Sequence, residues 1–366
     1  MTIYILNLLV SCMICFLGKR FRKSSLHLYI IFIIWVCLFT FRYRVGADSW
    51  TFNALLEVFK GRDVSFWDYM ATGPRDKLFS TIYYLCIKTL GMKRVWFYMV
   101  VAVLIYSPVI KVLKEKDNDL VFSVFLYCAL LWCYSGYNGT RQTIALGFCM
   151  LAYHNHLLKG KYIKYAVLML VAYGFHSAAI FALPFHLLSL KPLKSRWVLW
   201  GTLILTALLL FLPSVWNAII DALDALGQEK MANDYATLSS KGANYLRVLV
   251  QAIPTLIVLL RFSTLKKRFP DIEPLVVLNL LATVLSFFML RNAIFARFVA
   301  IVDVSSIFLL PKIPYAFSED RHSKAGELIL VTMVVLYFAY MVLIIRSGDA
   351  HLYPYQFLPN LDATWH

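Results

Sequence analysis

Long apolar runs constrain this chain more than any other feature of its sequence. The hydrocarbon core of a bilayer is about 30 Å thick, so a helix needs roughly 20 apolar residues to cross it, and about 17 at the short end. Stretches approaching this length recur along the chain and predict an all-α polytopic integral membrane protein. They run near Thr2–Leu17, Leu26–Phe41, Val95–Leu113, Leu120–Tyr134, Thr143–Leu158, Trp197–Leu212, Leu246–Phe262, Leu275–Leu290, Ile294–Leu310 and Leu328–Ile345.

Composition supports this prediction. Hydrophobic residues make up 61% of the chain and charged residues 15%, against about 45–50% and about 25% in soluble domains. These values exclude an ordinary cytosolic enzyme, a disordered protein and a disulfide-rich secreted domain. The net charge of +16 is typical of cytoplasmic loops that follow the positive-inside rule. No soluble basic domain is present, so a nucleic-acid partner is not expected.

Two segments do not read as simple spans. Tyr162–Leu190 has lysines at both ends and is too long for one span but too short for two. Its polar break at Gly174–Ser177 predicts a helical hairpin over residues 162–190 with His176 at the apex. Lys77–Leu90 is apolar but short, which favours a re-entrant or surface-lying helix. The chain is expected to form a single membrane domain, residues 1–366, with about 11–13 transmembrane or re-entrant helices.

Lysine clusters orient the chain, because they favour the cytoplasmic side. The opposite, outer side then carries an outer loop over residues 42–75, an amphipathic outer loop over 213–245, Ser135–Gln142 and the C-terminal tail. Several polar and ionisable side chains gather at helix ends on this side, where charges are costly and usually mark a substrate path. They are Arg42, Arg44, Asp48, Tyr137, Asn138, Arg141, Gln142, His176, Arg291 and Arg297.

These residue types suit a lipid-linked pyrophosphate. Guanidinium groups present planar forks that match phosphate oxygens, and Arg141 and Gln142 open a helix whose N-terminus also attracts anions. A histidine titrates near about pH 6.5, so His176 can accept a hydroxyl proton. Asp48 can orient that histidine, pair with an arginine or act as the base itself. Each group also has a structural alternative: arginines anchor helices among headgroups, and a buried histidine can be satisfied by its neighbours.

No signature of soluble-substrate or metal chemistry accompanies these groups. The seven cysteines show no metal-ligand spacing, and no Walker A, GxSxG, HExxH or nucleotide-sugar motif occurs. No metal and no cofactor is therefore expected. A transferase with this sequence would draw its donor from the membrane.

Three blocks of sequence resemble the EpsG family of Wzy-like polysaccharide polymerases. Phe41–Asn53 is similar to an R-x-x-x-G-x-D element, with Ala47 in place of a commoner threonine. Tyr137–Phe185 resembles the N-x-x-R-Q helix followed by F-H-x-S-A, and this block is the most specific. The pair Arg291 and Arg297 is similar to a closing element with a following aromatic residue.

This resemblance implies a fold with an outward-facing cavity, similar to C-superfamily glycosyltransferases that use lipid-linked donors. It implies a metal-independent transfer of the growing glycan from undecaprenyl pyrophosphate to the terminal sugar hydroxyl of an incoming lipid-linked repeat. The product is left open between O-antigen, capsule and exopolysaccharide. The implied location is the bacterial cytoplasmic (inner) membrane, multi-pass, with a periplasmic or extracellular active face. Implied partners are the lipid bilayer, the lipid-linked donor and acceptor, a chain-length regulator and the flippase of the pathway.

On this interpretation each candidate has an expected role. His176, Arg141 and Asp48 are the catalytic candidates, and the remaining polar side chains of the outer side bind substrate. The first alternative is a lipid-linked oligosaccharide flippase, which often has inverted repeats, whereas no repeat is evident here. The second is a membrane O-acyltransferase of surface glycans, for which His154 and His156 near the cytoplasmic side are the favourable feature. The predicted substrate-binding set is Arg44, Arg42, Tyr137, Asn138, Gln142, Arg291 and Arg297.

Overall fold

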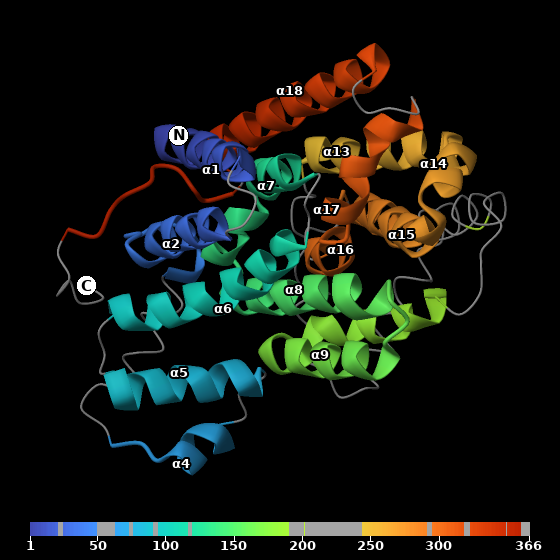
Figure 1. Cartoon of the computed structure of the whole chain (residues 1–366). Helices are drawn as coiled ribbons and strands as arrows, with labels where there is room; N and C mark the ends of the chain where they lie inside the picture. Colours follow the sequence, from blue (N-terminus) through green and yellow to red (C-terminus); the bar gives the residue numbers. More distant parts are fainter. Residues whose placement is uncertain are drawn as a thin grey trace. The chain divides into compact units, whose positions relative to one another are not determined.

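The protein is all-helical in the part of the chain that the structure describes (Figure 1). This computed structural model describes residues 1–20, 25–49, 63–72, 76–90, 94–115, 119–189, 201, 244–290, 295–317, 323–348 and 350–359. Within these ranges no β-strand is formed, and the β-type pairing is a single isolated antiparallel bridge between Arg42 and Phe357. The predicted all-α fold is confirmed.

Several helices are long and apolar enough to cross a membrane, which makes this a polytopic membrane protein. Three qualify singly among the described residues: Val95–Lys114 within α6 (Arg94–Lys114), Pro270–Met289 including α15 (Glu273–Met289), and α18 (Lys324–Ser347). The mean hydropathy of α18 reaches 2.8, and only 28% of its apolar window is buried within the protein. A fourth span arises if α13 (Tyr245–Leu260) and α14 (Phe262–Arg268), bent by 75°, cross together.

Other predicted spans form helices that are shorter than a bilayer. Apolar helices of this kind occur at Thr2–Gly18 within α1 (Thr2–Arg20), α2 (Leu26–Thr40), α7 (Leu120–Ala129) and α9 (Tyr162–Phe175). The described helices therefore do not reach the predicted 11–13 spans by length alone.

Two continuous spans predicted from apolar runs are interrupted in the structure. The run near 143–158 becomes α8 (Thr140–Ala152) followed by a π-helical turn, Tyr153–Leu157. The run near 294–310 is divided between α16 (Ala296–Asp303) and α17 (Ser306–Leu309). Serine hydroxyls at this second break bond to the preceding turn, which competes with regular helix geometry. At this second break, local polar groups thus end a helix that hydropathy alone would continue.

The chain divides into two compact units. The first comprises Met1–His186 with Leu330–His366, and the second comprises Leu187–Ile329. The predicted single membrane domain over residues 1–366 stays a prediction. The predicted loop over 213–245 lies almost wholly outside the described residues, as does the predicted span near 197–212.

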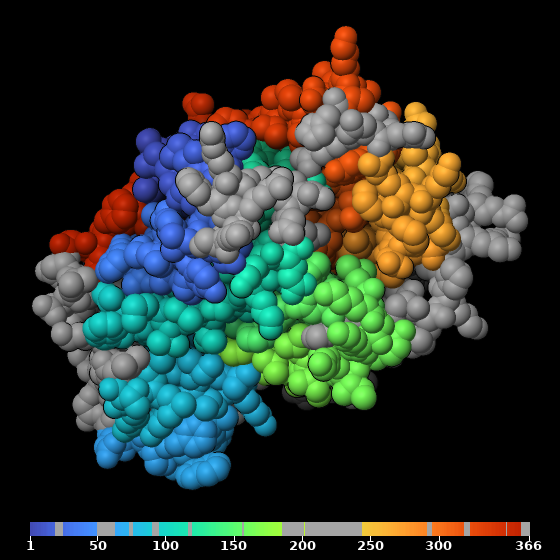
Figure 2. All heavy atoms as spheres, in the orientation of Figure 1, coloured from blue at the N-terminus to red at the C-terminus, as the bar shows by residue number. Residues whose placement is uncertain are grey.

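In the first unit, helices pack side by side in a continuous series. Helix α2 lies against α6, α6 against α8, α8 against α9, and α9 against α5 (Lys77–Leu90). In the space-filling view the atoms of α2 and α6 lie against one another (Figure 2). Helix α1 is joined by polar side chains to α2 and to the 3₁₀ turn before α8: Trp35 Nε1 donates to Ser11 Oγ at 3.1 Å, and Asn7 Nδ2 donates to Tyr134 Oη at 2.7 Å. Such interhelical hydrogen bonds fix neighbouring helices in an apolar environment.

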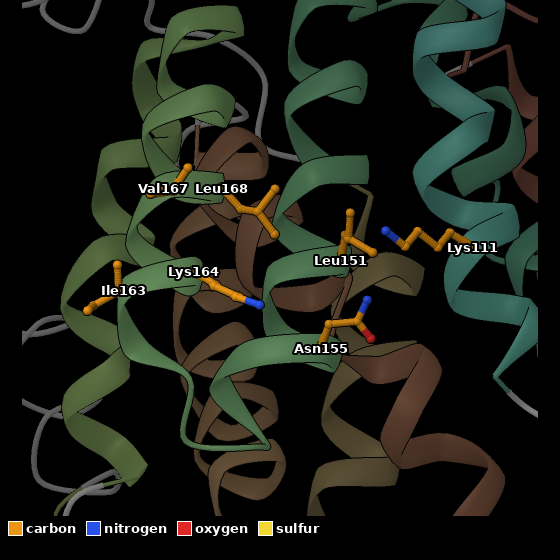
Figure 3. A pocket seen from close by; sticks show the side chains of 7 residues that line it. All are labelled: Lys111, Leu151, Asn155, Ile163, Lys164, Val167 and Leu168. Atoms are coloured by element: carbon orange, nitrogen blue, oxygen red, sulfur yellow. The ribbon is translucent and has the colours of Figure 1, made fainter.

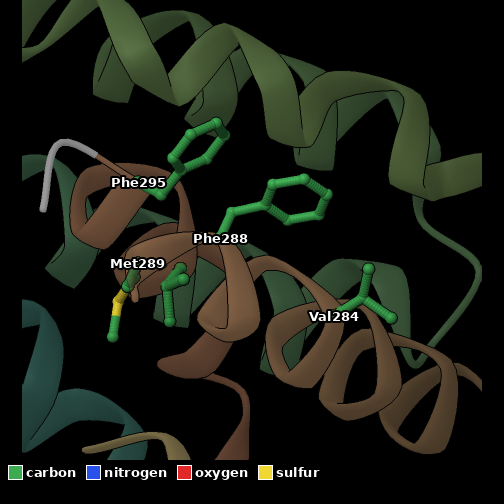
Figure 4. Close-up of a cluster of buried hydrophobic side chains, with 5 residues drawn as sticks. Val284, Phe288, Met289 and Phe295 are labelled. Atoms are coloured by element: carbon green, nitrogen blue, oxygen red, sulfur yellow. The ribbon is translucent and has the colours of Figure 1, made fainter. Parts of the chain in front are cut away.

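In the second unit, α15 carries two kinds of contact. Val284, Phe288 and Met289 pack with Phe295 and with Val299 of α16 in an apolar cluster (Figure 4). One turn earlier, a buried hydrogen-bonded chain crosses between helices. Thr255 Oγ1 donates to Asn279 Oδ1 at 2.6 Å, and Asn279 Nδ2 donates to Ser306 Oγ at 3.1 Å.

The segment predicted as a hairpin over 162–190 breaks at His176. Helix α9 ends at Phe175, His176 is extended (φ −155°, ψ 121°), and a 3₁₀ helix follows over Ser177–Ser189. The return of this second arm to the lysine-rich side stays a prediction. Helix α5 has 14 residues, so its interpretation as a re-entrant or surface-lying helix also remains open.

Candidate active site

Three segments that are distant in sequence meet at the carboxylate of Asp76. Its Oδ2 lies 2.9 Å from Arg141 Nη1, and its Oδ1 accepts a hydrogen bond from the Ser177 backbone N–H at 3.1 Å. The Asp76 backbone carbonyl accepts from Ser80 N at 2.9 Å, which starts α5 directly after this residue. The side chain is only 4% exposed. Asp76 therefore ties the beginning of α5 to the beginning of α8 and to the end of α9.

Arg141 is the accessible member of this group. It is the second residue of α8, and its side chain is 44% exposed. Its guanidinium carbon lies 6.0 Å from the centre of the Phe79 ring. The buried carboxylate thus orients the guanidinium from one side while nearly half of the side chain stays accessible to a ligand.

His176 is the third member and makes no hydrogen bond to any residue that the structure describes. Its Nδ1 lies 3.7 Å from Asp76 Oδ2, which is too long for a hydrogen bond but within reach of an ion pair if the ring is protonated. Both ring nitrogens are buried and make no hydrogen bond. Buried polar groups are nearly always hydrogen-bonded, so an unpartnered imidazole beside a carboxylate indicates a functional position. We call Asp76, Arg141 and His176 the Arg–Asp–His cluster.

The environment of Asp76 holds it in the ionised form. Burial opposes ionisation, but the His176 ring, the Arg141 guanidinium and the Ser177 amide together outweigh burial, so the pKa of Asp76 lies below its ordinary value. A carboxylate between two basic side chains can hold a proton-accepting ring in place. It can also stabilise the cation that forms when that ring is protonated.

Asp76 did not emerge from the sequence, which placed the edge of the outer loop at residue 75. The available signal was an aspartate at the start of a helix, which reads as a helix cap. Nothing in that local pattern indicates partners at positions 141 and 176.

Asp48, a predicted catalytic residue, caps the helix that carries Arg141. Its Oδ2 accepts the Thr140 backbone N–H at 2.6 Å, at the first turn of α8, where the N-cap Gly139 has no side chain to accept it. Burial raises the pKa of Asp48, and the two Thr140 hydrogen bonds and the arginine charges nearby oppose that rise. The carboxylate within 4 Å of a His176 ring nitrogen is that of Asp76 and not that of Asp48. Asp48 therefore stabilises the helix that carries Arg141.

Asn138, just before α8, is hydrogen-bonded to the loop that contains Ala47 and to the C-terminal segment at Ala350. Its Oδ1 accepts from Ala47 N at 2.9 Å, and its Nδ2 donates to the Ala350 carbonyl. Gly46 N donates in turn to the His351 carbonyl at 3.0 Å. The predicted substrate contact at Asn138 thus holds the loop around Gly46, the start of α8 and the C-terminal segment together.

Gly46 provides a test of this arrangement. Its φ is +86°, and an added Cβ would lie 2.1 Å from the Tyr137 carbonyl oxygen. We expect Gly46→Ala to destabilise the protein by about 2–4 kcal/mol, because backbone strain and overlap act together. Gly348→Ala is the matched control, since Gly348 has φ +82° but nothing within 4 Å of its Cβ position, and it should cost about 1 kcal/mol. Equal melting temperatures of the two variants in detergent would contradict the close packing at Gly46.

Arg42 and Tyr137, both predicted to bind substrate, are buried. Arg42 is 0% exposed, and its guanidinium lies 3.8 Å from the Phe39 ring centre and 4.6 Å from the Tyr137 ring centre. Arg42 Nη1 also donates to the Phe39 carbonyl at 3.2 Å. Aromatic faces attract a desolvated cation, so this arginine fixes the end of α2 from within. Arg44, in contrast, is exposed, with φ +52°.

The remaining candidates are not members of this cluster or lie outside the described residues. Gln142 is half-buried in the first turn of α8, and Arg297 is exposed on α16 of the second unit. Arg291 lies outside the described residues. His154 Nε2 lies 3.0 Å from Glu115 at the other end of α8. Among the described residues no group of His, Cys, Asp and Glu is arranged to hold a metal ion; the predicted independence of metal stays a prediction.

Comparison with protein families assigns the chain to a family. The sequence model of the EpsG family matches residues 25–357. The chain belongs to the EpsG family. The matched range includes all three residues of the Arg–Asp–His cluster in this EpsG-family protein, and membership suggests a role like that of the polysaccharide polymerases. Comparison with curated proteins and with solved structures finds no match for the chain.

Proposed function

We propose that this EpsG-family protein polymerises lipid-linked oligosaccharide repeat units. The growing glycan moves from undecaprenyl pyrophosphate to the terminal sugar hydroxyl of an incoming lipid-linked repeat. The observation that carries the proposal is the Arg–Asp–His cluster, which combines an accessible guanidinium with an unpartnered imidazole around one buried carboxylate. Such a cluster provides the two groups that this transfer needs, an anion-binding cation and a proton acceptor.

Arg141 binds the pyrophosphate of the donor. A guanidinium forms short, charge-assisted hydrogen bonds to phosphate oxygens. The backbone N–H groups at the N-terminus of α8 also attract an anion. Negative charge on the pyrophosphate grows as the bond to the sugar breaks, so a fixed cation lowers the barrier for departure. The exposed Arg44 is the second candidate contact. Asp48 and Arg42 support these residues from within.

His176 accepts the proton of the acceptor hydroxyl. The hydroxyl oxygen attacks the anomeric carbon, a new glycosidic C–O bond forms, and the C–O bond to pyrophosphate breaks with its electron pair. Undecaprenyl pyrophosphate leaves, and the hydroxyl proton passes to the imidazole. Asp76 stabilises the resulting imidazolium, much as a buried carboxylate does in hydrolytic triads. A single displacement of this kind inverts the anomeric configuration.

In this proposal the cluster faces the periplasm or cell exterior of a bacterial inner-membrane protein. Donor and acceptor lipids lie side by side in the bilayer, which raises the effective concentration of the reacting sugars. A chain-length regulator and the pathway's flippase are the proposed protein partners.

Asp76 acts as a positioning residue, and its charge can be tested separately. A carboxyl group whose pKa is lowered by folding stabilises the fold above its unfolded pKa, and this contribution is lost as pH falls through the folded pKa. We expect Asp76→Asn to cost about 1 kcal/mol at neutral pH, with the difference from wild type starting to shrink as pH falls below the ordinary pKa of 3.8 toward the lower folded pKa. Thermal unfolding of both proteins in detergent, at several pH values from about 7 down to about 3, measures this difference in stability. A difference that does not change with pH would contradict an ionised Asp76.

The reaction itself is tested in a cell-free assay. Purified full-length protein in detergent is given synthetic undecaprenyl-pyrophosphate repeat units, and the products are sized on a gel. A ladder of longer glycans supports the proposal. Folded protein that forms no ladder but moves lipid-linked glycan across liposomes would make it a flippase. Failure in both assays, with acyl transfer to glycan detected instead, would identify an acyltransferase.

A further inference from the structure

A cavity of about 320 Å³ lies near the other end of α8, among α6, α8 and α9 (Figure 3). Its lining combines the basic Lys111 and Lys164 with the apolar Leu151, Val167 and Leu168. Ten residues separate Arg141 from Leu151 on α8, which corresponds to about 15 Å along the helix. The cavity is therefore separate from the Arg–Asp–His cluster.

Two lysines bring positive charge to this cavity without acidic partners. Lys111 is in the last turn of α6 and Lys164 in the first turn of α9, and both are exposed. Their amines point toward one another across Leu151 and Asn155 (Figure 3). Neither forms an ion pair with any residue that the structure describes.

Glu115, the residue directly after α6, is already paired. Glu115 Oε2 lies 3.0 Å from His154 Nε2 and 3.2 Å from Lys159 Nζ. It is thus neutralised by its own basic neighbours and not by the cavity lysines. Among the residues that the structure describes, the cavity therefore keeps a local excess of positive charge, which favours an anion.

The apolar walls of the cavity favour an anion that has a hydrocarbon chain. Ile163 is 83% exposed, Val167 54% and Leu170 56%, so an apolar face of α9 extends outward from the cavity. In a polytopic membrane protein such a face contacts acyl chains. A small soluble anion would gain nothing from it, whereas a phospholipid would use both the lysines and the apolar wall.

We propose that this cavity binds an anionic membrane phospholipid, with its phosphate between Lys111 and Lys164 and an acyl chain along α9. Basic pockets between transmembrane helices bind anionic headgroups in this way. Lysine-rich helix ends favour the cytoplasmic side, where the bound lipid would lie in the inner leaflet. This proposal does not depend on the polymerase activity.

Native mass spectrometry of the purified full-length protein tests the proposal directly. The protein is titrated with phosphatidylglycerol and, separately, with zwitterionic phosphatidylcholine of the same acyl chains. We expect tighter binding of phosphatidylglycerol, and an affinity about 30-fold lower in the Lys111→Gln/Lys164→Gln variant, from two lysine–headgroup contacts. The matched control is Lys114→Gln/Lys161→Gln, which removes the same charge from exposed lysines at the same helix ends but outside the cavity.

Three outcomes would overturn the proposal. Equal loss in both double variants would mean that net charge, not the cavity, attracts the lipid. Equal binding of the two lipids by wild type would remove the role of the lysines. Competition by inorganic phosphate at millimolar concentration would identify a soluble anion as the occupant. Retained lipid binding in the control, lost binding in the cavity variant and no phosphate competition would support it.

Discussion

Replacing His176 by glutamine is expected to slow glycan extension by about 10²–10⁴-fold, the usual contribution of a general base. Glutamine approximates the size of the ring but cannot accept a proton at neutral pH. Among the described residues the imidazole makes no hydrogen bond, and its Nδ1 lies 3.7 Å from Asp76 Oδ2, so its replacement should lower the melting temperature only modestly. Initial rates of ladder formation measure the loss, and the melting temperature in detergent establishes that the variant is folded.

A matched histidine and a rescue experiment separate chemistry from structure. His154→Gln makes the same change at the other end of α8, where the ring pairs with Glu115, and should keep full activity. His176→Gly should regain activity when imidazole is added, because a free imidazole can occupy the vacated space and accept the proton. A folded His176→Gln protein with the wild-type rate would rule out His176 as the base.

The fold class could be predicted because hydropathy averages over many residues. Apolar runs such as Val95–Leu113 and Leu328–Ile345 correspond closely to α6 and α18. Span lengths were harder to predict, since they depend on single hydrogen bonds. The π-helical turn after Ala152 and the break at Ser305 interrupt runs that look continuous in the sequence.

The site was partly predictable for a related physical reason. Arg141 and His176 stand out because an ionisable side chain in an apolar setting is costly. Asp76 carries the same signal, but it precedes a short helix and reads as a cap. The burial of Arg42 could not be predicted either, because its cage is built from rings on α2, α6 and the turn before α8. Only the folded structure shows that the Arg42 guanidinium is enclosed by aromatic rings whereas the Arg141 guanidinium stays accessible.

Arg141 should be the second residue whose loss nearly abolishes extension. We expect Arg141→Gln to lower the rate by about 10²–10³-fold, the cost of losing one fixed donor at a developing charge. The variant also leaves Asp76, 4% exposed, without its closest cation, so a modest fall in melting temperature is expected as well. Ladder formation and thermal unfolding are measured on the same preparations.

Arg141→Lys distinguishes the geometry of the guanidinium from its charge. Lysine keeps the positive charge but lacks the planar fork that binds two oxygens at once, so melting temperature should recover more than activity does. Arg346→Gln is the control, because Arg346 is an exposed arginine in the last turn of α18 with no ion pair among the described residues. Full activity in Arg141→Lys would show that charge alone suffices. Full activity in folded Arg141→Gln would mean that the pyrophosphate does not bind at Arg141. A loss of activity at position 141 but not at position 346 supports the guanidinium of Arg141, oriented by Asp76, as the group that binds the leaving pyrophosphate.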